Sequence, residues 1–414
     1  MLLRFRFGNH RSFRDVQELS MVAANLKGED GYVVKDASGL DVLPVAVIYG
    51  ANASGKSNVV DALSTMRSNA LFSSESHSPQ QVVKRRPFSL DNDSAAKTSS
   101  FEVDFSASGT RYQYGFELAD HAFEKEFLNA FPHGRTQKLF ERAGQDFDFG
   151  RNLQGQNRVI AGLTRPDRSF VAAASANNHV KIQEMLLSIA DMQLIEFFSY
   201  NSFDVYKIFK NREIGNDVIN FLRSIDSGII GLKKNKHIAF DTDEMEDFFE
   251  FNIKIQSEGE SLPSSFSMIH AGHDGANFPL PMRDESAGTR RLLVLLAQVY
   301  LALDTGTLLV VDELDAHLHT QACDAILGLF ASPNTNPKGA QLICTTHDTN
   351  LLLSPHLRRD QIWFTEKNEE GATSLYPLSD YQLRKGDNIE KGYLQGRFGA
   401  VPFSGSRVEI VGAD

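Results

Sequence analysis

Residues 50–58, with the sequence GANASGKSN, have the types and spacing of a loop that binds phosphate. Glycines at positions 50 and 55 let backbone N–H groups turn inward around an anion, and the helix that follows presents its positive N-terminus. Lys56 supplies a cation to the outer phosphates of ATP, and Ser57 offers a hydroxyl to Mg²⁺. The alternative, an ordinary glycine turn, is weakened by the apolar strand before the loop and the amphipathic helix after it. The expected ATP-binding residues are Gly50, Ala51, Asn52, Ala53, Ser54, Gly55, Lys56, Ser57 and Asn58.

Residues 308–319, LLVVDELDAHLH, place two carboxylates at the end of an apolar run that indicates a buried strand. Asp312 can hold Mg²⁺, usually through water, and Glu313 can polarise the water that attacks the terminal phosphate. A surface turn would explain such a strand end equally well on its own, but the phosphate loop upstream favours the catalytic interpretation. His317 and His319 could form a metal pair, yet at a helix start their side chains diverge, so loop or interface roles are favoured.

Two further segments of the sequence carry residues that could contact a phosphate. His347 follows the apolar run AQLICTT, at the kind of strand end where open α/β sheets place ligands. It could contact the γ-phosphate or the attacking water; a structural histidine is the alternative when it is taken alone. The run 286–289 precedes a long apolar helix and is a second candidate anion-binding helix terminus, with a plain N-cap as the alternative. Its residues are Ser286, Ala287, Gly288 and Thr289.

The order of these elements resembles the ABC-type ATPase family, in the branch that holds SMC and other DNA-repair ATPases. ESAGT stands where that family has its LSGGQ-like signature, LDAHLH where it has the D-loop, and FGNHRSFRD resembles the opening strand and loop of that branch. A closer resemblance, over residues 1–130 and 275–414, is to the small AAA-labelled, OLD-like ATPases of bacterial abortive-infection and phage-defence operons, such as the ATPase subunit of ATPase–TOPRIM pairs like PARIS. It is carried by DESAGTRRL, DELDAHLH, QLICTTHDTNLL, RRDQIWFTEK and YLQGRFGAVPF.

The sequence departs from the ABC-type pattern at two places. Ala287 stands where many transporters carry glycine, and no leucine precedes Ser286; both features are usual in this branch. The glutamine of the Q-loop is not placed. Gln80 and Gln81 are candidates, although an ordinary surface glutamine is the favoured interpretation of each.

The resemblance implies ATP and Mg²⁺ as cofactors, and ATP hydrolysis at a composite site between two subunits. Mg²⁺ would be held by Ser57 and Asp312. The catalytic residues would be Glu313 and His347. The signature run 286–289 of one chain would close over ATP bound to the other, an arrangement that a symmetric homodimer satisfies twice.

The resemblance also implies partners. The chain would form a homodimer or higher homo-oligomer, sense a phage trigger protein, and control a separate effector, a TOPRIM-type or other nuclease from a neighbouring gene. Two alternatives stay open: a DNA-repair-type ATPase that acts directly on nucleic acid, and a nucleotide-dependent scaffold that does not hydrolyse ATP.

The elements that must position these residues follow an α/β pattern. Residues 1–160 are expected to form the N-terminal part of an ABC-type P-loop core, with antiparallel strands and a hairpin closed near Ser108-Gly109. Residues 161–274 are expected to be a mainly helical insertion, because KIQEMLLSIADMQLIEFF and NDVINFLRSID carry apolar residues at three- and four-residue spacing. Residues 275–414 are expected to complete the core as a mixed, mostly parallel sheet with flanking helices.

The insertion is the expected docking site for an effector, with a structural lid as the alternative, and the packing of much of its apolar face on the core is a second possibility left open. Acidic residues at 241–247 would form the rim of this site. The apolar helical face consists of Met185, Leu186, Ile189, Leu194 and Ile195.

The composition excludes several classes of protein. Of 414 residues, 42 are Lys or Arg and 53 are Asp or Glu, so the net charge of −11 argues against a protein that coats nucleic acid by bulk charge. Only Cys323 and Cys344 are present, too few for a disulfide framework or a four-cysteine metal site. No run approaches the roughly 18 apolar residues of a membrane-spanning helix, so we expect a cytoplasmic protein. Short basic runs at 84–86 and 232–236 are expected to be solvated surface.

Overall fold

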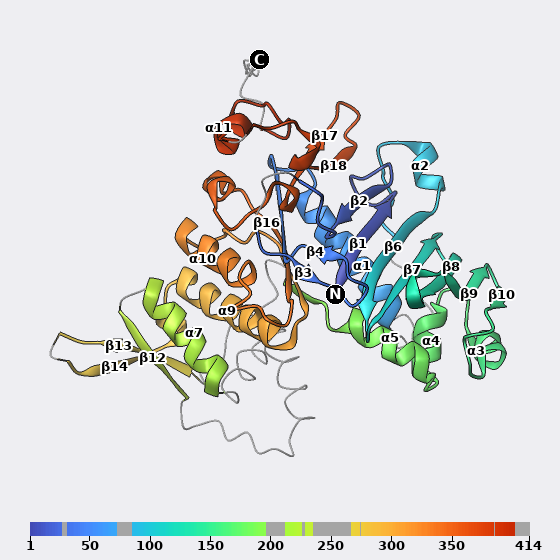
Figure 1. The fold of residues 1–414 in the computed structure, drawn as a ribbon, viewed down its shortest axis with the longest axis horizontal. Coiled ribbons are helices and arrows are strands. Elements are labelled where there is room, and N and C mark those ends of the chain that lie inside the picture. The colour runs from blue at the N-terminus through green and yellow to red at the C-terminus, as the bar shows by residue number, and fades with distance from the viewer. Residues whose placement is uncertain are drawn as a thin grey trace, which may run out of the picture.

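The fold is described from a computed structural model of the chain (Figure 1). The residues that it describes are 1–26, 31–72, 85–195, 212–225, 228–234, 266–273, 275–384 and 386–401. In this part of the chain, a mixed sheet and a larger antiparallel sheet pack with helices around two hydrophobic cores. The predicted α/β class, a P-loop core with N-terminal antiparallel strands, is confirmed.

The central sheet carries the apolar strands that the sequence predicts. In spatial order its strands are β11 (Gln193–Ile195), β15 (Leu308–Val311), β16 (Gln341–Thr345), β5 (Val45–Gly50), β17 (Ile362–Lys367) and β18 (Thr373–Pro377). The first five are parallel, and β18 pairs antiparallel with β17. Strand β5 lies inside the sheet and is buried along its whole length, which explains its unbroken apolar sequence.

The antiparallel sheet contains the N-terminus of the chain. In spatial order its strands are β10 (Asp146–Phe149), β9 (Gln137–Ala143), β8 (Phe123–Phe131), β7 (Thr110–Leu118), β6 (Ser99–Ala107), β1 (Leu2–Gly8) and β2 (Gln17–Ser20). The predicted hairpin is β6–β7, closed by Ser108 and Gly109. Both residues have positive φ, 47° and 78°, as the common two-residue hairpin turn requires. A separate short pair is formed by β3 (Val34–Lys35) and β4 (Asp41–Val42).

The helices of the described residues are α1 (Lys56–Phe72), α2 (Asn92–Ala96), α3 (Asn157–Leu163), α4 (Phe170–Ala176), α5 (Val180–Ala190), α7 (Arg212–Ile225), α9 (Ala287–Thr305), α10 (Thr320–Phe330) and α11 (Ile389–Leu394). The two faces of the central sheet enter different cores. Along β5, Ala46 and Ile48 enter the core that contains α1, α4, α5 and the antiparallel sheet. Val47 and Tyr49 enter the opposite core, which contains α7, α9 and α10.

Residues 161–274, expected to be mainly helical, contain strands as well as helices. The helix over KIQEMLLSIADMQLIEFF ends at Ala190, and residues 193–195 instead form β11, because the edge of β15 offers backbone partners to them. Strands β12 (Ile229–Lys234), β13 (Phe266–Ala271) and β14 (Asn277–Pro281) form a small antiparallel sheet, which projects at the lower left of Figure 1. The described part of this segment therefore contains both helices and strands, and β11 belongs to the central sheet.

The apolar face expected to receive an effector is largely unavailable. Met185, Leu186 and Ile189 are buried in the core that α5 shares with α1. The side chains at 194–195 and the acidic residues at 241–247 lie outside the described residues.

Of the basic run at 84–86, expected at the solvated surface, residue 84 lies outside the described residues, Arg86 is exposed as expected, and Arg85 is largely buried. Arg85 donates to the carbonyl oxygens of Ala95 and Lys97, and its side chain is only 4% exposed. Arg86 donates to the Asp61 carboxylate at 2.8 Å. Among the described residues, no helix combines the length and hydropathy needed to cross a membrane.

A buried ion pair joins the antiparallel sheet to the start of α4. The side chains of Glu126 on β8 and Arg142 on β9 are fully buried, with 3.3 Å between Oε2 and Nη1. The Glu126 carboxylate also accepts from the N–H groups of Phe170 at 2.7 Å and Val171 at 3.2 Å, in the first turn of α4. Arg142 donates to the Arg168 carbonyl at 2.6 Å. These bonds compensate two buried charges and fix α4 on the sheet.

We expect Arg142→Ala to lower the free energy of unfolding by roughly 3–5 kcal/mol, because Glu126 would remain buried without its countercharge. Lys138→Ala is the matched control, since its ion pair with Asp148 lies on the solvated side of neighbouring strands and should barely change the denaturation midpoint. Urea denaturation followed by circular dichroism measures both variants. Equal stability of the two would contradict the anchoring role of the buried pair.

Candidate functional site

The predicted site residues gather at one edge of the central sheet. Strands β15, β16 and β5 are adjacent and parallel, so their carboxyl ends meet at this edge. The phosphate loop follows β5, Asp312 follows β15, and His347 lies two residues after β16. Burial lowers the pKa of Lys56, and the charges of Asp312 and Glu313 partly offset this effect. Three segments that are far apart in sequence therefore form one site.

Strands β17 and β18 hold the phosphate loop from outside. The Ser54 hydroxyl lies 2.6 Å from the Thr365 hydroxyl, and Thr373 Oγ1 donates to the Ser54 carbonyl at 2.8 Å. Gly55 has a φ of 114°, and a Cβ at this position would lie 2.8 Å from Thr373 Oγ1. Only glycine fits this conformation and this gap. Ala53 also has a positive φ, 62°, of the kind that turns successive N–H groups toward one side of a loop.

Lys56 is buried inside the loop. Its Nζ donates to the carbonyl oxygens of Gly50 at 2.9 Å and Ala51 at 3.0 Å. Burial lowers the pKa of this amine to about 8, against the opposing effect of the nearby carboxylates, chiefly Asp312. The lysine thus braces the loop with the same amine that a phosphate would engage, so the binding of a phosphate exchanges carbonyl contacts for an anion.

The Thr345 side chain organises the two carboxylate residues of the neighbouring strand. Its hydroxyl donates to Asp312 Oδ1 at 2.6 Å and accepts from the backbone N–H of Glu313 at 2.7 Å. Glu313 has a φ of 52°, in the left-handed region that costs free energy for a residue other than glycine. One hydroxyl therefore fixes both the Asp312 carboxylate and the strained turn at Glu313.

Arg291 connects the signature helix to the same turn. This side chain lies on α9 and is 6% exposed. Its Nη2 donates to the carbonyl oxygen of Glu313 at 2.5 Å and, at 3.4 Å, to that of Asp312. The strained backbone at Glu313 is thus held from the N–H side by Thr345 and from the carbonyl side by α9.

The run 286–289 stands at the start of α9 with its polar groups at the surface. Ser286 is the N-cap, because its Oγ accepts from the Thr289 N–H at 3.0 Å. Gly288 lies against the segment after Glu313, where a Cβ would come within 2.7 Å of the His317 carbonyl oxygen. Ser286 and Ala287 are exposed. The N-cap role accounts for the presence of Ser286 within one chain. Because Ser286 and Ala287 are exposed, the run is also accessible to a second chain.

His347 is exposed at the end of β16, and its backbone N–H donates to Asp315 Oδ1 at 3.1 Å. Partial desolvation, followed by the charge of Lys56, lowers the pKa of the imidazole below its ordinary value of 6.5. The ring is therefore neutral at pH 7 and can accept a hydrogen bond from water or donate one to a phosphate oxygen.

The oxygen groups present fit Mg²⁺ bound together with a nucleotide. Ser57 is exposed in the first turn of α1, and the Asp312 carboxylate is oriented by Thr345. Hydroxyl and carboxylate oxygens are the ligands that Mg²⁺ prefers. Across the described ranges no group of three or more His, Cys, Asp or Glu could hold another metal ion. His319 instead caps α10 by accepting from the Gln321 N–H at 3.2 Å.

Several residues of this site are not identified by the sequence analysis: Thr345, Arg291, Thr365 and Thr373. The position of Thr345, two residues before the strand-end histidine, is a usable signal for a hydroxyl at this edge. Thr365 and Thr373 are more than 300 residues from the loop, and only the pairing of β5 with β17 brings them to it. The Q-loop candidates at 80–81 lie outside the described residues.

Known proteins similar to this chain comprise one domain family and several solved structures. Residues 45–354 match the family model described as "AAA domain, putative AbiEii toxin, Type IV TA system". No curated protein matches the chain significantly. Among solved structures, the SMC head domain from Thermotoga maritima shares 12% identity at a TM-score of 0.41, over 92% of this chain and 99% of that one. An SMC head bound to the C-winged helix domain of ScpA shares 13% identity at a TM-score of 0.42, and the match covers 91% of this chain and 97% of that chain. At these TM-scores the likeness supports neither a function nor an assembly.

We expect Thr345→Val to reduce the rate of ATP hydrolysis by about 10- to 100-fold, because valine keeps the shape of the side chain and removes the hydroxyl that orients Asp312. Thr345→Ser restores a hydroxyl and should retain most of the activity. Phosphate release at saturating Mg-ATP measures both rates. A valine variant as fast as the wild type would show that Asp312 and Glu313 are positioned without this hydroxyl.

Proposed function

We propose that this chain, which belongs to the AAA-domain family described as the putative AbiEii toxin of type IV toxin–antitoxin systems, is a regulatory ATPase whose active site is completed by a second copy. One observation carries the proposal. The phosphate loop, the carboxylates of Asp312 and Glu313, and His347 stand at the ends of three adjacent parallel strands. A cation, a metal-binding carboxylate and a second carboxylate at one sheet edge are the parts that phosphoryl transfer to water requires.

The residues of this edge have distinct roles in the proposed reaction. Bound Mg-ATP supplies the phosphoryl group and the metal that neutralises its charge. Lys56 turns from the loop carbonyls to the outer phosphates. Ser57 and Asp312 would hold the metal. Glu313 would take a proton from the attacking water as its oxygen bonds to the γ-phosphorus and the bond from phosphorus to ADP breaks. His347, neutral at pH 7, orients the water or the γ-phosphate.

The signature run is proposed to act on the ATP of a second copy. Its exposure at the start of α9 supports this, because the N–H groups at a helix terminus bind an anion only where one can reach them. Arg291, on the same helix, holds the Glu313 carbonyl of its own chain. Engagement of Ser286 by the partner's nucleotide would therefore act on the geometry of both sites of a symmetric dimer.

A regulatory role through a separate protein, in anti-phage abortive infection, is the cellular function that we propose. The description of the matched family names a putative toxin of a type IV toxin–antitoxin system, and this supports a role together with a partner. Direct action on nucleic acid has less support, because Arg85 and Arg86 are bound to carbonyl oxygens and to Asp61 of the same chain. A nuclease effector encoded nearby remains the partner we propose.

We expect Glu313→Gln to bind ATP with unchanged affinity and to hydrolyse it at least about 100-fold more slowly, because the amide cannot accept the proton of the attacking water. The slow variant should accumulate as an ATP-bound dimer. Phosphate release and light scattering with and without ATP measure the two effects, and Glu369→Gln, an exposed glutamate, is the control. Turnover within about threefold of wild type would remove Glu313 from the catalytic role.

We expect a mixture of Ser286→Arg and Lys56→Ala proteins to recover part of the activity that each lacks alone. In a mixed dimer one site combines an intact phosphate loop with an intact signature run, whereas the other site lacks both. ATPase rates across mixing ratios, with heterodimers quantified by differently tagged subunits, provide the measurement. Heterodimers that form and stay inactive would show that each chain uses its own signature run.

A further inference from the structure

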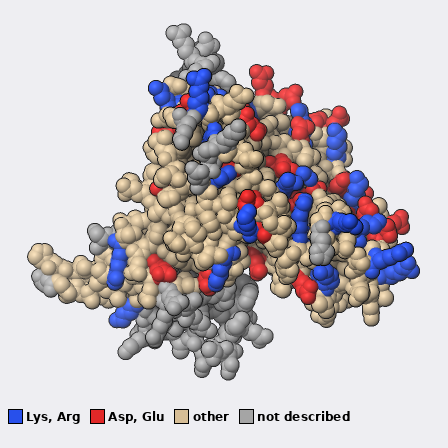
Figure 2. Space-filling view, viewed as in Figure 1, with Lys and Arg blue, Asp and Glu red and all other residues tan. Residues whose placement is uncertain are grey.

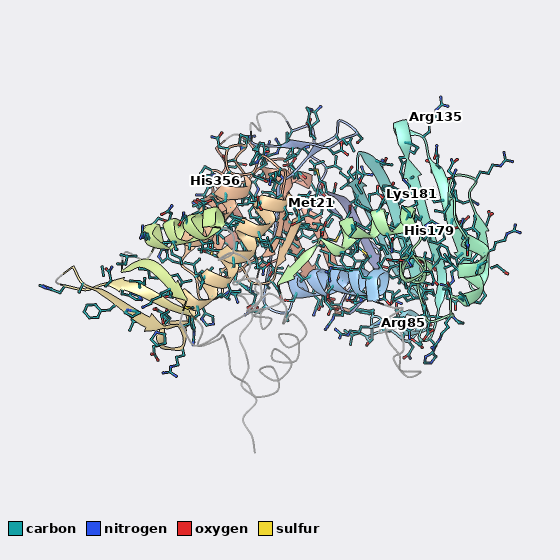
Figure 3. All side chains as sticks on the ribbon, turned by 90° about the horizontal axis from the view of Figure 1, so that it is seen from below. Met21, Arg85, Arg135, His179, Lys181 and His356 are labelled. Atoms are coloured by element: carbon teal, nitrogen blue, oxygen red, sulfur yellow. The ribbon has the colours of Figure 1, made fainter. Side chains whose placement is uncertain are left out.

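The small antiparallel sheet of β12, β13 and β14 leads directly into the signature run. Strand β14 ends at Pro281, the 3₁₀-helix η2 (Met282–Asp284) follows, and Glu285 then precedes Ser286, the N-cap of α9. Figures 1 and 3 both show the sheet projecting from the body of the molecule near α7 and α9. Figure 2 shows mainly uncharged surface over this projection. The chain therefore passes from a projecting sheet into the run that is proposed to meet a second copy.

The small sheet is anchored in the hydrophobic core that also contains α7 and α9. Ile229 on β12, Met268 on β13 and Met282 in η2 are all buried in this core. A close-packed core resists the displacement of side chains that fill it. Strand β13 therefore has a fixed position relative to the body of α9, from which it can hold neighbouring residues in place.

His270 on β13 binds the residue that precedes the signature run. Its Nε2–H donates to Glu285 Oε1 at 2.7 Å. The Glu285 side chain is only 6% exposed and the His270 side chain 22% exposed. A carboxylate that is withdrawn from water needs hydrogen-bond donors from the protein in place of water. The imidazole is such a donor, and it ties Glu285 to the small sheet.

Glu285 and Ser286 form an extended link between η2 and α9, with ψ angles of 157° and 152°. The Ser286 hydroxyl binds within the first turn of α9: its Oγ accepts from the Thr289 N–H at 3.0 Å and lies 2.8 Å from the Thr289 hydroxyl. These two bonds close the helix start on itself. The side chain of Glu285, in contrast, reaches another element, so it fixes where the peptide before Ser286 lies.

We propose that His270 is a positioning residue for the signature run, because by holding Glu285 it sets the direction in which Ser286 and the start of α9 face the nucleotide of a second copy. The first N–H groups of a helix have no partner within the helix, so their direction decides whether they reach a phosphate. The inference rests on the proposed function, since it requires ATP bound to the other copy. It adds a residue of one chain that controls hydrolysis on the other.

We expect His270→Leu to hydrolyse ATP at least about tenfold more slowly than wild type, because leucine fills the space without donating to Glu285 and the signature run is then misplaced. Its affinity for ATP should be unchanged, since the phosphate loop is untouched. His270→Gln is the matched variant: its amide N–H can take the place of Nε2–H, so it should retain most of the activity. Phosphate release and the binding of a fluorescent ATP analogue measure the rate and the affinity.

Mixed dimers test on which chain His270 acts. A mixture of His270→Leu with Lys56→Ala should recover activity, because one site then combines an intact phosphate loop with a correctly placed signature run. A mixture of His270→Leu with Ser286→Arg should stay slow, because neither chain offers a correctly placed run. An effect of His270 on its own chain's ATP site would give the opposite pattern. A general loss of folding would not separate the two mixtures.

The reference mixture of Ser286→Arg with Lys56→Ala separates this inference from the proposed function. If the reference mixture stays inactive although heterodimers form, there is no composite site and both proposals are overturned. If it recovers, the role of His270 alone is overturned by a leucine variant as fast as wild type, by a glutamine variant as slow as leucine, or by recovery with Ser286→Arg. Glu285→Leu removes the same bond from its other partner and should behave like His270→Leu, which keeps the test decisive if His270→Leu does not fold.

Discussion

Strand β5 is buried on both faces, with Val47 in one hydrophobic core and Ile48 in the other, and this constraint decides where chemistry can take place. A charged side chain along β5 would be desolvated in either core at a cost of several kcal/mol. Polar groups can therefore function only where the strands end. Because β15, β16 and β5 run in parallel, their ends coincide at one edge, and the phosphate loop, Asp312 and His347 meet there.

The backbone turn at Glu313 is where the separate parts of the site are joined. Thr345 binds its N–H and Arg291 its carbonyl, so β16 and α9 both act on one residue in a left-handed conformation. Such a conformation persists only where its surroundings over-determine it. A displacement at the exposed end of α9 can thus reach the carboxylate through two hydrogen bonds. This short path gives the proposed closure by a second copy a physical route to catalysis.

Sequence patterns predicted turns that depend on neighbouring residues, whereas strands and contacts that depend on pairing between distant segments could not be predicted from them. The hairpin at Ser108-Gly109 could be predicted locally, because its turn needs positive φ at two successive residues and glycine at the second position adopts it readily. The residues 193–195 continue the apolar spacing of α5, and nothing local distinguishes a further helical turn from the edge strand that β15 induces. The support of Ser54 by Thr365 and Thr373 is invisible in sequence for the same reason, since it exists only through the pairing of β17 and β18 with the central sheet.

Helix α5 shows why the apolar face predicted for docking is buried instead. Met185 and Ile189 lie on the side that packs against α1, whereas Val180 and Leu187 lie on the opposite, exposed side. A surface helix needs a single apolar stripe to join a core, and a second stripe costs free energy in water. Hydrophobic periodicity cannot tell which stripe the core will take. On α5 the core takes the stripe of Met185 and Ile189, and the stripe of Val180 and Leu187 stays at the surface.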